Sequence, residues 1–456
     1  MIFHDDLDKL QAINTAMIAS FPTLRRRKET MLTLDLGSSA KTCDGVSRRH
    51  FMKIGALGVG GLTLADLLRL EADAGAASPH KAIINIHMNG GPSHQDIFDL
   101  KPSAPVEYRG EFNPIETNVA GMEICEHLPK LATMADKFAV VRSLVGSSAG
   151  HSDLQTHTGY GRNSLEVVGG RPSIGAIASR LIGAGPEGAP AWVSYNKGPT
   201  GFFGPRYGPF EGGKSLKLNT SLTPDRLDDR TELLGSLDRL RREMDTSGQM
   251  DALDSYTQTA VGIVTSGTMA DALDIKLEDP NVVARYGKVN SNLLLARRLV
   301  QAGVRVITLR CAWGNFDTHS DNFTRLKKTN LPNMDQGLSA LLWDLDRLGM
   351  LNDTMVVSWG EFGRTPRIAN KGGRNHWPKV SMAFMAGGGL KTGQMVGSTD
   401  RHAGEAQDRP LHFQEVHATM HHSLGIDSRS VTVLDPAGRP QYLLEPEYRE
   451  PIRELV

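Results

Sequence analysis

Cysteine, aromatic side chains and net charge are all scarce in this sequence of 456 residues. Its cysteines, Cys43, Cys125 and Cys311, are too few for a disulfide framework and show no Cys-x-x-Cys spacing for zinc or redox chemistry. Lys and Arg number 51, as do Asp and Glu, and this balance argues against an electrostatic grip on nucleic acid or anionic lipid. The composition, 39% hydrophobic and 22% charged, is globular. Any chemistry must therefore depend on histidine and carboxylate side chains.

Long hydrophobic runs are also absent, and this decides how we interpret the N-terminus. Arg48 and Arg49 precede an apolar, glycine-rich run over residues 54–70 that contains Asp66 and Arg69. That run is shorter than the roughly 20 apolar residues that cross a bilayer, and its charges argue against a membrane-anchoring helix. Small residues suited to cleavage follow it and end at Ala76. This order is typical of a twin-arginine export signal.

We therefore expect residues 1–76 to be an N-terminal extension with a twin-arginine signal peptide. Residues 77–456 would form the exported domain, with a helical insertion at about 199–289. The protein would use the twin-arginine export machinery, have no permanent membrane span, and be periplasmic or extracellular. Translation from Met31 is an alternative to Met1, because signals normally begin close to the start codon. One disulfide between Cys125 and Cys311 is possible outside the cytoplasm but not required.

Short apolar runs alternate with helical patterns from residue 81 onward. Strands that are apolar on both faces are predicted at residues 82–88, 138–144, 191–195, 304–311, 354–359 and 380–386. Leucines at helical spacing indicate helices within 233–240 and 338–348, and further helices are indicated at 292–302 and 412–424. The alternation predicts an α/β fold, a three-layer sandwich with a mostly parallel central sheet flanked by helices.

Side chains that can bind metal gather near the ends of the predicted strands, where sites form in open α/β sheets. In chain order the candidate ligands are His94, Asp96, His151, Asp317, His319, Glu361 and His376. The same segments contain Ser148, Ser152 and Arg364, which are candidates for catalytic roles. Mixed imidazole and carboxylate ligands suit zinc, manganese or a similar divalent ion. Convergence of these distant segments at one sheet edge would therefore form a metal site.

Each candidate also has a plainer interpretation. A lone histidine on a loop is more often a surface or hydrogen-bonded residue than a ligand, and Asp317 with His319 could form an Asx-turn. Glu361 could cap the next element, although an unpaired carboxylate behind a buried strand is costly. Arg364 could be a surface residue in a Gly-Arg turn. One further group is set aside as the half-exposed face of a C-terminal helix: His417, His421 and His422.

The motifs together resemble a known family. They comprise the twin-arginine start and the segments GGPSHQDIFDLKP, RGEF, ICEHLPKLA, DKFAVVRS, WGNFDTH, GEFGRTP, GGRNHWP and AGGGLKTG. The set is similar to that of a family of secreted bacterial proteins of unknown function, which is grouped with the alkaline phosphatase-like superfamily of sulfatases, phosphatases and phosphomutases. This resemblance covers essentially all of residues 77–456. It implies the superfamily's α/β core and a site with one or two metal ions acting on phosphate or sulfate esters.

The resemblance also implies roles for particular residues. Asp317 and His319 resemble the Asp and His ligands on the loop after a central strand. Glu361 stands where an Asp of the second metal centre follows the next strand, and His376 resembles the late ligand histidine. His151 is the expected ligand in the stretch that resembles the start of the nucleophile-bearing helix.

Several positions depart from the superfamily pattern. Asn89 and Gly90 stand where an acidic ligand usually follows the first strand, so His94 or Asp96 would have to substitute. The position aligned with the nucleophile falls near Ala149, which leaves Ser148 or Ser152 as candidates. Phe362 replaces a partner histidine. Neither Cys125 nor Cys311 has the Pro-x-Arg context for conversion to formylglycine, which argues against that type of sulfatase chemistry.

We expect an exported, metal-dependent hydrolase of phosphate or sulfate monoesters, holding zinc or manganese as one or two ions. Its substrate would be a small-molecule or glycan ester, and Arg364 would clamp the tetrahedral anion. The alternative is a catalytically degenerate member that binds a ligand, glycan or partner without turnover, which Asn89 and the lack of a clear nucleophile favour. An exported redox enzyme would fit the signal but has no supporting cofactor motif.

Overall fold

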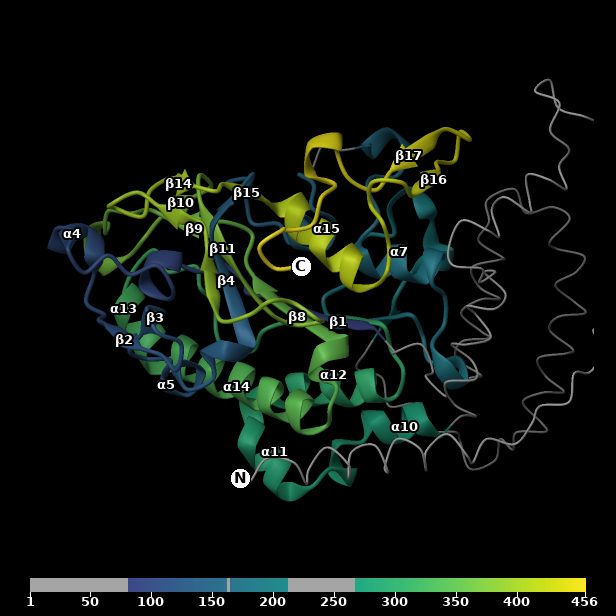
Figure 1. The fold of residues 1–456 in the computed structure, drawn as a ribbon, viewed down its shortest axis with the longest axis horizontal. Coiled ribbons are helices and arrows are strands. Elements are labelled where there is room, and N and C mark those ends of the chain that lie inside the picture. Colours follow the sequence, from purple (N-terminus) through teal and green to yellow (C-terminus); the bar gives the residue numbers. More distant parts are fainter. Residues whose placement is uncertain (1–80, 162–164, 212–266) are drawn as a thin grey trace, which may run out of the picture. The chain divides into compact units, whose positions relative to one another are not determined.

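A central sheet of nine strands organises the fold (Figure 1). The computed structural model describes residues 81–161, 165–211 and 267–456, all within one compact unit. The strands of this sheet are β1 (Ala82–His87), β4 (Phe138–Val145), β5 (Trp192–Ser194), β6 (Phe210–Glu211), β7 (Val306–Arg310), β8 (Thr354–Trp359), β11 (Ser381–Gly387), β12 (Gln394–Val396) and β15 (Leu411–His412). Their order is β12-β4-β11-β8-β1-β7-β5-β6, and β15 also pairs with β4.

Most of these strands run in one direction. β1 lies at the middle and pairs in parallel with β7 and β8, and β5 and β6 continue the parallel arrangement. β11 runs antiparallel to both of its neighbours, β8 and β4. The predicted α/β fold with a mostly parallel sheet is therefore confirmed, and the six predicted strands end within two residues of their expected bounds.

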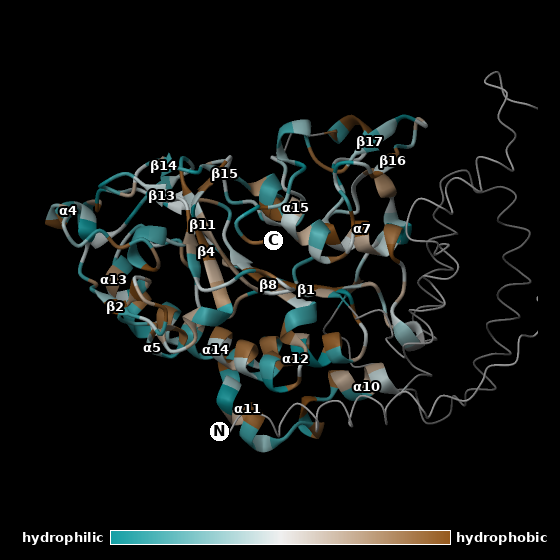
Figure 2. Cartoon of the chain, viewed as in Figure 1, coloured by the Kyte–Doolittle hydropathy of each residue, from teal (hydrophilic) through white to brown (hydrophobic). Residues whose placement is uncertain are grey.

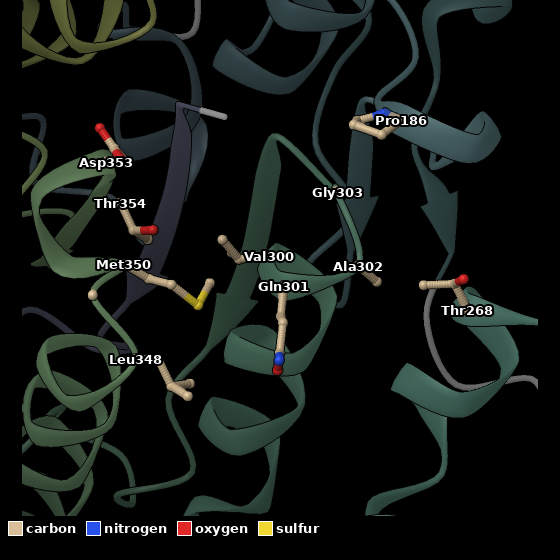
Figure 3. Close-up of a pocket in the computed structure, with 11 residues that line it drawn as sticks. Pro186, Thr268, Val300, Gln301, Ala302, Gly303, Leu348, Met350, Asp353 and Thr354 are labelled. Atoms are coloured by element: carbon tan, nitrogen blue, oxygen red, sulfur yellow. The ribbon is translucent and has the colours of Figure 1, made fainter. Parts of the chain in front are cut away.

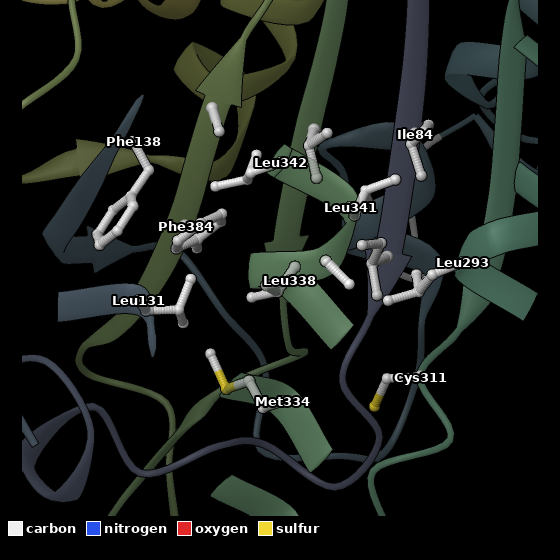
Figure 4. Close-up of a cluster of buried hydrophobic side chains, with 14 of the residues drawn as sticks. Ile84, Leu131, Phe138, Leu293, Cys311, Met334, Leu338, Leu341, Leu342 and Phe384 are labelled. Carbon is white, nitrogen blue, oxygen red and sulfur yellow. The ribbon is translucent and has the colours of Figure 1, made fainter. Parts of the chain in front are cut away.

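Helices cover both faces of the sheet, since the central strands are apolar on both sides. Along β1, Ile84 and Ile86 belong to the core on one face and Ile83 to the core on the other. α12 (Ser291–Gln301) and α14 (Leu331–Arg347) pack on the first face, where leucines of α14 meet Phe138 and Phe384 (Figure 4). α7 (Ile174–Leu181) and α15 (Phe413–Ser423) pack on the second, and the hydropathy colours show apolar strands between amphipathic helices (Figure 2).

The remaining elements are short and surround this framework. The other helices are α4 (Val106–Arg109), α5 (Pro129–Ala132), α6 (Leu154–Thr158), α10 (Thr268–Leu273), α11 (Pro280–Tyr286) and α13 (Asn322–Arg325). Separate two-stranded sheets are formed by β2 (Pro114–Glu116) with β3 (Glu123–Cys125), β9 (Gly363–Arg364) with β10 (His376–Trp377), β13 (Ser398–Thr399) with β14 (Ala406–Asp408), and β16 (Thr432–Leu434) with β17 (Pro440–Tyr442).

The region expected to be an insertion, about 199–289, is described at its two ends. At the first end, β6 adds an edge strand to the central sheet beside β5. At the other end, α10 and α11 contribute Met269, Ala272, Val282 and Tyr286 to the main core. The described ends thus belong to the body of the domain. Residues 212–266, which include the leucines predicted to form a helix within 233–240, lie outside the described residues.

Both cysteines in the described part of the chain are free thiols. Burial raises the pKa of Cys125 to about 12 and that of Cys311 to about 11, so both stay protonated and unreactive at neutral pH. Within residues 81–161, 165–211 and 267–456, none of the helices combines the length and apolar character that a membrane span requires. The predicted export signal, within residues 1–80, lies outside the described residues.

Candidate metal centre

Several loops meet at one edge of the sheet. The parallel strands β4, β1, β7 and β8 end at this edge, and β11 begins there because it runs in the opposite direction. Loops that are far apart in the sequence are therefore brought together. One ligand atom from each of His151, Asp317 and His376 lies within 4.8 Å of the others, and these three form the metal-capable group found in the described residues.

Asp317 lies at the centre of this group. Its Oδ1 is 3.0 Å from Nε2 of His319 and 3.2 Å from Nε2 of His376. Its Oδ2 is 3.4 Å from Nε2 of His151. The Nε2 atoms of His319 and His376 are 3.1 Å apart. The structure thus brings together four of the residues predicted as ligands: the Asp317 carboxylate and three imidazoles that present the same ring nitrogen to it.

The other nitrogen of each imidazole has its own hydrogen-bond acceptor. Nδ1 of His151 donates to the Glu361 carboxylate at 2.7 Å, and Nδ1 of His376 donates to the carbonyl of Ala149 at 2.8 Å. Nδ1 of His319 lies 2.8 Å from Oδ1 of Asn375. Because these oxygens accept hydrogen bonds, Nδ1 carries the ring proton and Nε2 keeps its lone pair. Protein metal sites orient their histidine ligands in this way.

This arrangement places acceptor atoms against one another. The Nε2 lone pairs of His319 and His376 face each other at 3.1 Å, which is unfavourable unless a proton or a cation lies between them. Ligand atoms held about 2.0–2.2 Å from a tetrahedral ion are roughly 3.3 Å apart. The distances around Asp317, from 3.0 to 3.4 Å, are close to that spacing. The spacing of His151, Asp317 and His376, with ligand atoms within 4.8 Å of one another, therefore fits a divalent ion, and His319 adjoins this group through Asp317 and His376.

Arg364 holds the central carboxylate in its ionised form. Its Nη2 lies 2.5 Å from Oδ1 of Asp317. Burial raises the pKa of Asp317, but the hydrogen bond and charge of Arg364, assisted by His319, outweigh it and bring the pKa down to about 2. A carboxylate that is ionised across the physiological range can bind a cation without first losing a proton.

The interpretation of Arg364 as a surface residue is wrong, because its side chain is fully buried. Its Nε donates to the carbonyl of Gly91 at 2.9 Å and its Nη1 to the carbonyl of Arg374 at 2.9 Å. Its Nη2 donates to the carbonyl of Gly90 as well as to Asp317. With these donors committed to the protein, Arg364 positions Asp317 and the loop after β1, and it has little left for a bound anion.

Glu361 forms hydrogen bonds that hold His151 and the loop after β1 in place. It follows β8 and is only 2% exposed. Its Oε1 accepts from the backbone N–H of Gly90 at 3.0 Å and from His151. Its Oε2 lies 3.5 Å from Nε2 of His87 and has no hydrogen-bond partner among the described residues. Glu361, predicted as a ligand, therefore contacts Nδ1 of His151, on the side of the ring opposite the nitrogen that faces Asp317.

His87, the last residue of β1, was missed by the sequence analysis. Its Nδ1 lies 3.0 Å from Oγ1 of Thr156, whose hydroxyl donates to the carbonyl of Asp153. The hydroxyl therefore accepts from Nδ1, and Nε2 of His87 turns its lone pair toward Glu361. Burial lowers the pKa of His87, although the Glu361 charge opposes this. A polar residue ending an otherwise apolar strand was the available signal.

Gly90 allows the loop after β1 to approach the Asp317 loop closely. Its φ is +92°, and a Cβ there would lie 2.3 Å from the backbone nitrogen of Asp317 and 2.3 Å from Oδ1 of Asn315. Any side chain would push the Asp317 loop away. The neighbouring Asn89 has a buried Oδ1 without a hydrogen-bond partner among the described residues.

Asp96 and His94 have other partners. Both Asp96 oxygens are paired with Arg374, at 2.8 and 2.9 Å. Oδ2 also accepts from Ser93 and Asn322. His94 is fully buried with its Nε2 3.0 Å from the carbonyl of Ala403, and burial lowers its pKa. Asp96 thus forms a buried ion pair, and neither residue contacts the cluster around Asp317.

The two serines considered as nucleophiles flank His151. Ser148 is exposed, and its backbone N–H donates to Oε1 of Gln155 at 3.1 Å. Ser152 is half-buried, and its hydroxyl accepts from the backbone N–H of Leu154 at 3.3 Å. Each therefore lies on the segment that carries a candidate ligand, close to the cluster along the chain.

The histidines of α15 are not on a half-exposed face, contrary to the sequence analysis. His417 and His421 are buried, and only His422 of the three is exposed. Nε2 of His417 lies 3.1 Å from the carbonyl of Gln155, and Nδ1 of His421 lies 2.7 Å from Oγ of Ser428. The helix points the imidazoles of His417 and His421 into the core on the α7 and α15 face of the sheet. Their hydrogen-bond partners, Gln155 and Ser428, do not belong to the cluster around Asp317.

A cavity of about 470 Å³ lies at the other edge of the sheet (Figure 3). Thr354 begins β8 and Gly303 precedes β7, so this cavity opens at the amino ends of the strands. Its lining is largely apolar, and its one carboxylate, Asp353, is paired with Lys81 at 2.5 Å. It therefore offers none of the chemistry found around Asp317.

Comparison with solved structures gives weak likenesses. The chain is similar to Ps i-CgsB (10% identity, TM-score 0.35, covering 76% of this chain and 72% of that one). It is also similar to the PsFucS1 sulfatase from Pseudoalteromonas sp. (12% identity, TM-score 0.32, covering 80% of this chain and 70% of that one). A third likeness is to the lipoteichoic acid synthase LtaP from Listeria monocytogenes (13% identity, TM-score 0.30, covering 77% of this chain and 73% of that one). At these scores none of the three bears on the chemistry of the site.

Sequence comparison is more informative. No curated protein matches the chain. One family model does match, over residues 80–456. It describes DUF1501, a family of proteins of unknown function. The matched range contains every residue of the cluster around Asp317. The chain belongs to the DUF1501 family.

Proposed function

We propose that this chain is an exported, alkaline phosphatase-like, metal-dependent hydrolase of phosphate or sulfate monoesters. The observation that carries the proposal is the convergence of three imidazole Nε2 atoms on the ionised carboxylate of Asp317. His151, His319, His376 and Asp317 would hold one divalent ion. Three imidazoles and one carboxylate favour zinc over manganese, which prefers oxygen ligands.

The surrounding residues prepare this ligand set. Glu361 fixes the tautomer of His151, and Arg364 keeps Asp317 ionised and in place. The exposed fractions of the His151 and His319 side chains are 45% and 48%, so an ester can reach the cluster from solvent. When bound, such an ion polarises the ester oxygen and lowers the pKa of a hydroxyl or water nucleophile toward about 7. Ser148, Ser152 or a water molecule would supply that nucleophile.

Metal analysis tests the proposal directly. Purified protein from residue 77 onward should bind about one zinc per chain and hydrolyse aryl phosphates or aryl sulfates. Asp317→Asn should lose at least about tenfold in metal affinity, because it removes the shared anionic ligand. Asp427→Asn is a matched control, since Asp427 is an exposed carboxylate that also pairs with an arginine. Protein without stoichiometric metal, or Asp317→Asn with unchanged activity, would refute the proposal.

A second candidate is a degenerate member that binds a ligand, glycan or partner without turnover. The occupation of the usual acidic position by Asn89 and Gly90 favours it, because this removes a ligand expected of a second ion. Two zinc ions per chain would count against this candidate and would point to His87, Asn89 and Glu361 as the further ligands. Ligand binding that survives chelation, with no turnover on a panel of esters, would support it.

A further inference from the structure

A second polar group adjoins the cluster on the side of β7 and β5. The β1–β7 register pairs His87 with Arg310, the last residue of β7. The β5–β7 register pairs Ser194 with Thr308, so Asn196 continues the same row two residues later. Arg310 and Asn196 therefore lie level with His87 at the sheet edge, and Nε2 of His87 lies 3.5 Å from Oε2 of Glu361.

The segment around α6 joins the two groups. Its residue His151 belongs to the cluster, while Asp153 lies 2.9 Å from Nη2 of Arg310. Thr156 contacts His87, and His157 contacts Asn196. One short stretch of chain thus touches the candidate metal ligands at one end and the Arg310 group at the other.

Arg310 is fixed on two sides but stays accessible. Its Nε donates to Oδ1 of Asn196, and its Nη2 donates to Oδ2 of Asp153. Asn196 is itself buried, and its Nδ2 donates to Nε2 of His157 at 3.1 Å, which sets the orientation of the amide. More than half of the Arg310 side chain, 53%, is exposed. Its Nη1 has no hydrogen-bond partner among the described residues.

Other arginines near the cluster are committed to the protein. Arg364 is buried with its donors satisfied. Arg325 donates to the carbonyls of Asn315 and Asp317 at 3.1 and 3.2 Å. Arg310 therefore differs from both, because its guanidinium is held rigid by Asn196 and Asp153 while the Nη1 edge remains open to solvent. A planar, preorganised guanidinium of this kind suits the oxygens of an oxyanion.

We infer that Arg310 binds the oxyanion of the substrate, contacting the non-bridging oxygens of a phosphate or sulfate group. This inference rests on the proposed function, since the anion would lie between Arg310 and the cluster around Asp317. It assigns to Arg310 the role that sequence analysis gave to Arg364. Phosphate and sulfate share this chemistry, and binding experiments distinguish them.

Calorimetric titration of the zinc-loaded protein with inorganic phosphate and, separately, with sulfate tests the inference. Arg310→Met should raise the Kd of the preferred anion about tenfold or more, because it removes a charge-assisted hydrogen bond. Arg429→Met serves as the matched control, since Arg429 is 60% exposed and also pairs with an aspartate. Its Kd should equal that of the wild type. A lower Kd for phosphate than for sulfate would identify the phosphate ester as the substrate, and the reverse would identify the sulfate ester.

Arg310→Lys covers the case in which the methionine variant does not fold. It keeps the charge but loses the fork held by Asn196 and Asp153, and its Kd should lie between those of the wild type and Arg310→Met. The inference is overturned if both Arg310 variants bind the anion as the wild type does, or if zinc-loaded wild type binds neither anion. Absence of bound zinc, in contrast, would refute the proposed function itself, so the two failures are distinguishable.

Discussion

At the scale of single residues, the cluster depends on which ring nitrogen each histidine presents. The acceptors Glu361, Ala149 and Asn375 take the Nδ1 protons, and the Nε2 atoms are left to converge on Asp317. Glu361 is the strongest of these acceptors because it is a carboxylate in a buried position. Sequence placed Glu361 at the correct strand end but could not show that it faces the rear of an imidazole.

Glu361→Gln tests this positioning role. The amide can still accept from Nδ1 of His151 but lacks the negative charge that makes the imidazole a stronger ligand, so zinc affinity should fall about 10- to 100-fold. Competition titration against a zinc-binding dye measures the effect. Glu450→Gln, at a side chain that is 71% exposed, is the control and should leave affinity unchanged. Equal affinity in wild type and Glu361→Gln would show that Glu361 does not support the ligand set.

At the scale of elements, the long apolar strands were predictable and the small elements were not. β8 matches its predicted bounds because a buried parallel strand is apolar throughout. β6, with two residues, Phe210 and Glu211, is too short to leave a pattern and becomes a strand only by pairing with β5. The convergence of Asp317, His151 and His376 followed from strand direction. The partners of Asp96 and Arg364 did not, because an ion pair between distant loops leaves no mark in the sequence.

The burial of His417 and His421 on α15 makes the stability of the fold depend on pH. Burial lowers the pKa of His417 and that of His421 to about 3, whereas the unfolded value is about 6.5. Between these values the unfolded chain binds protons that the folded chain does not, so stability falls as pH decreases below about 6.5. Each histidine contributes a slope of about 1.4 kcal/mol per pH unit in that range.

Urea unfolding at several pH values between 7 and 4.5 measures this slope. His421→Asn should reduce the slope of unfolding free energy against pH by about 1.4 kcal/mol per pH unit. The reason is that the unfolded variant binds one proton fewer than the unfolded wild type. His422→Asn, in the exposed neighbour on the same helix, should leave the slope as in the wild type. An unchanged slope in His421→Asn would contradict a buried, neutral His421.

At the scale of the whole molecule, the two edges of the sheet have different contents. The carboxyl edge carries the cluster around Asp317 and the Arg310 group, while the amino edge carries a largely apolar cavity. The family match begins at residue 80, at the start of the described domain, and the preceding residues contain the paired arginines. The export signal in these preceding residues remains a prediction from the sequence.

The double substitution Arg48→Lys with Arg49→Lys tests the predicted export signal. Recognition by the twin-arginine machinery depends on the two guanidinium groups, so the variant should remain inside the cell with its N-terminus uncleaved. The wild type should be recovered outside the cytoplasm and begin near Ala77. Cell fractionation followed by N-terminal sequencing distinguishes these results. Arg26→Lys with Arg27→Lys is the matched control, because that basic run is not followed by an apolar segment, and its export should be normal. Export of the Arg48 and Arg49 variant at the wild-type level would rule out the twin-arginine route.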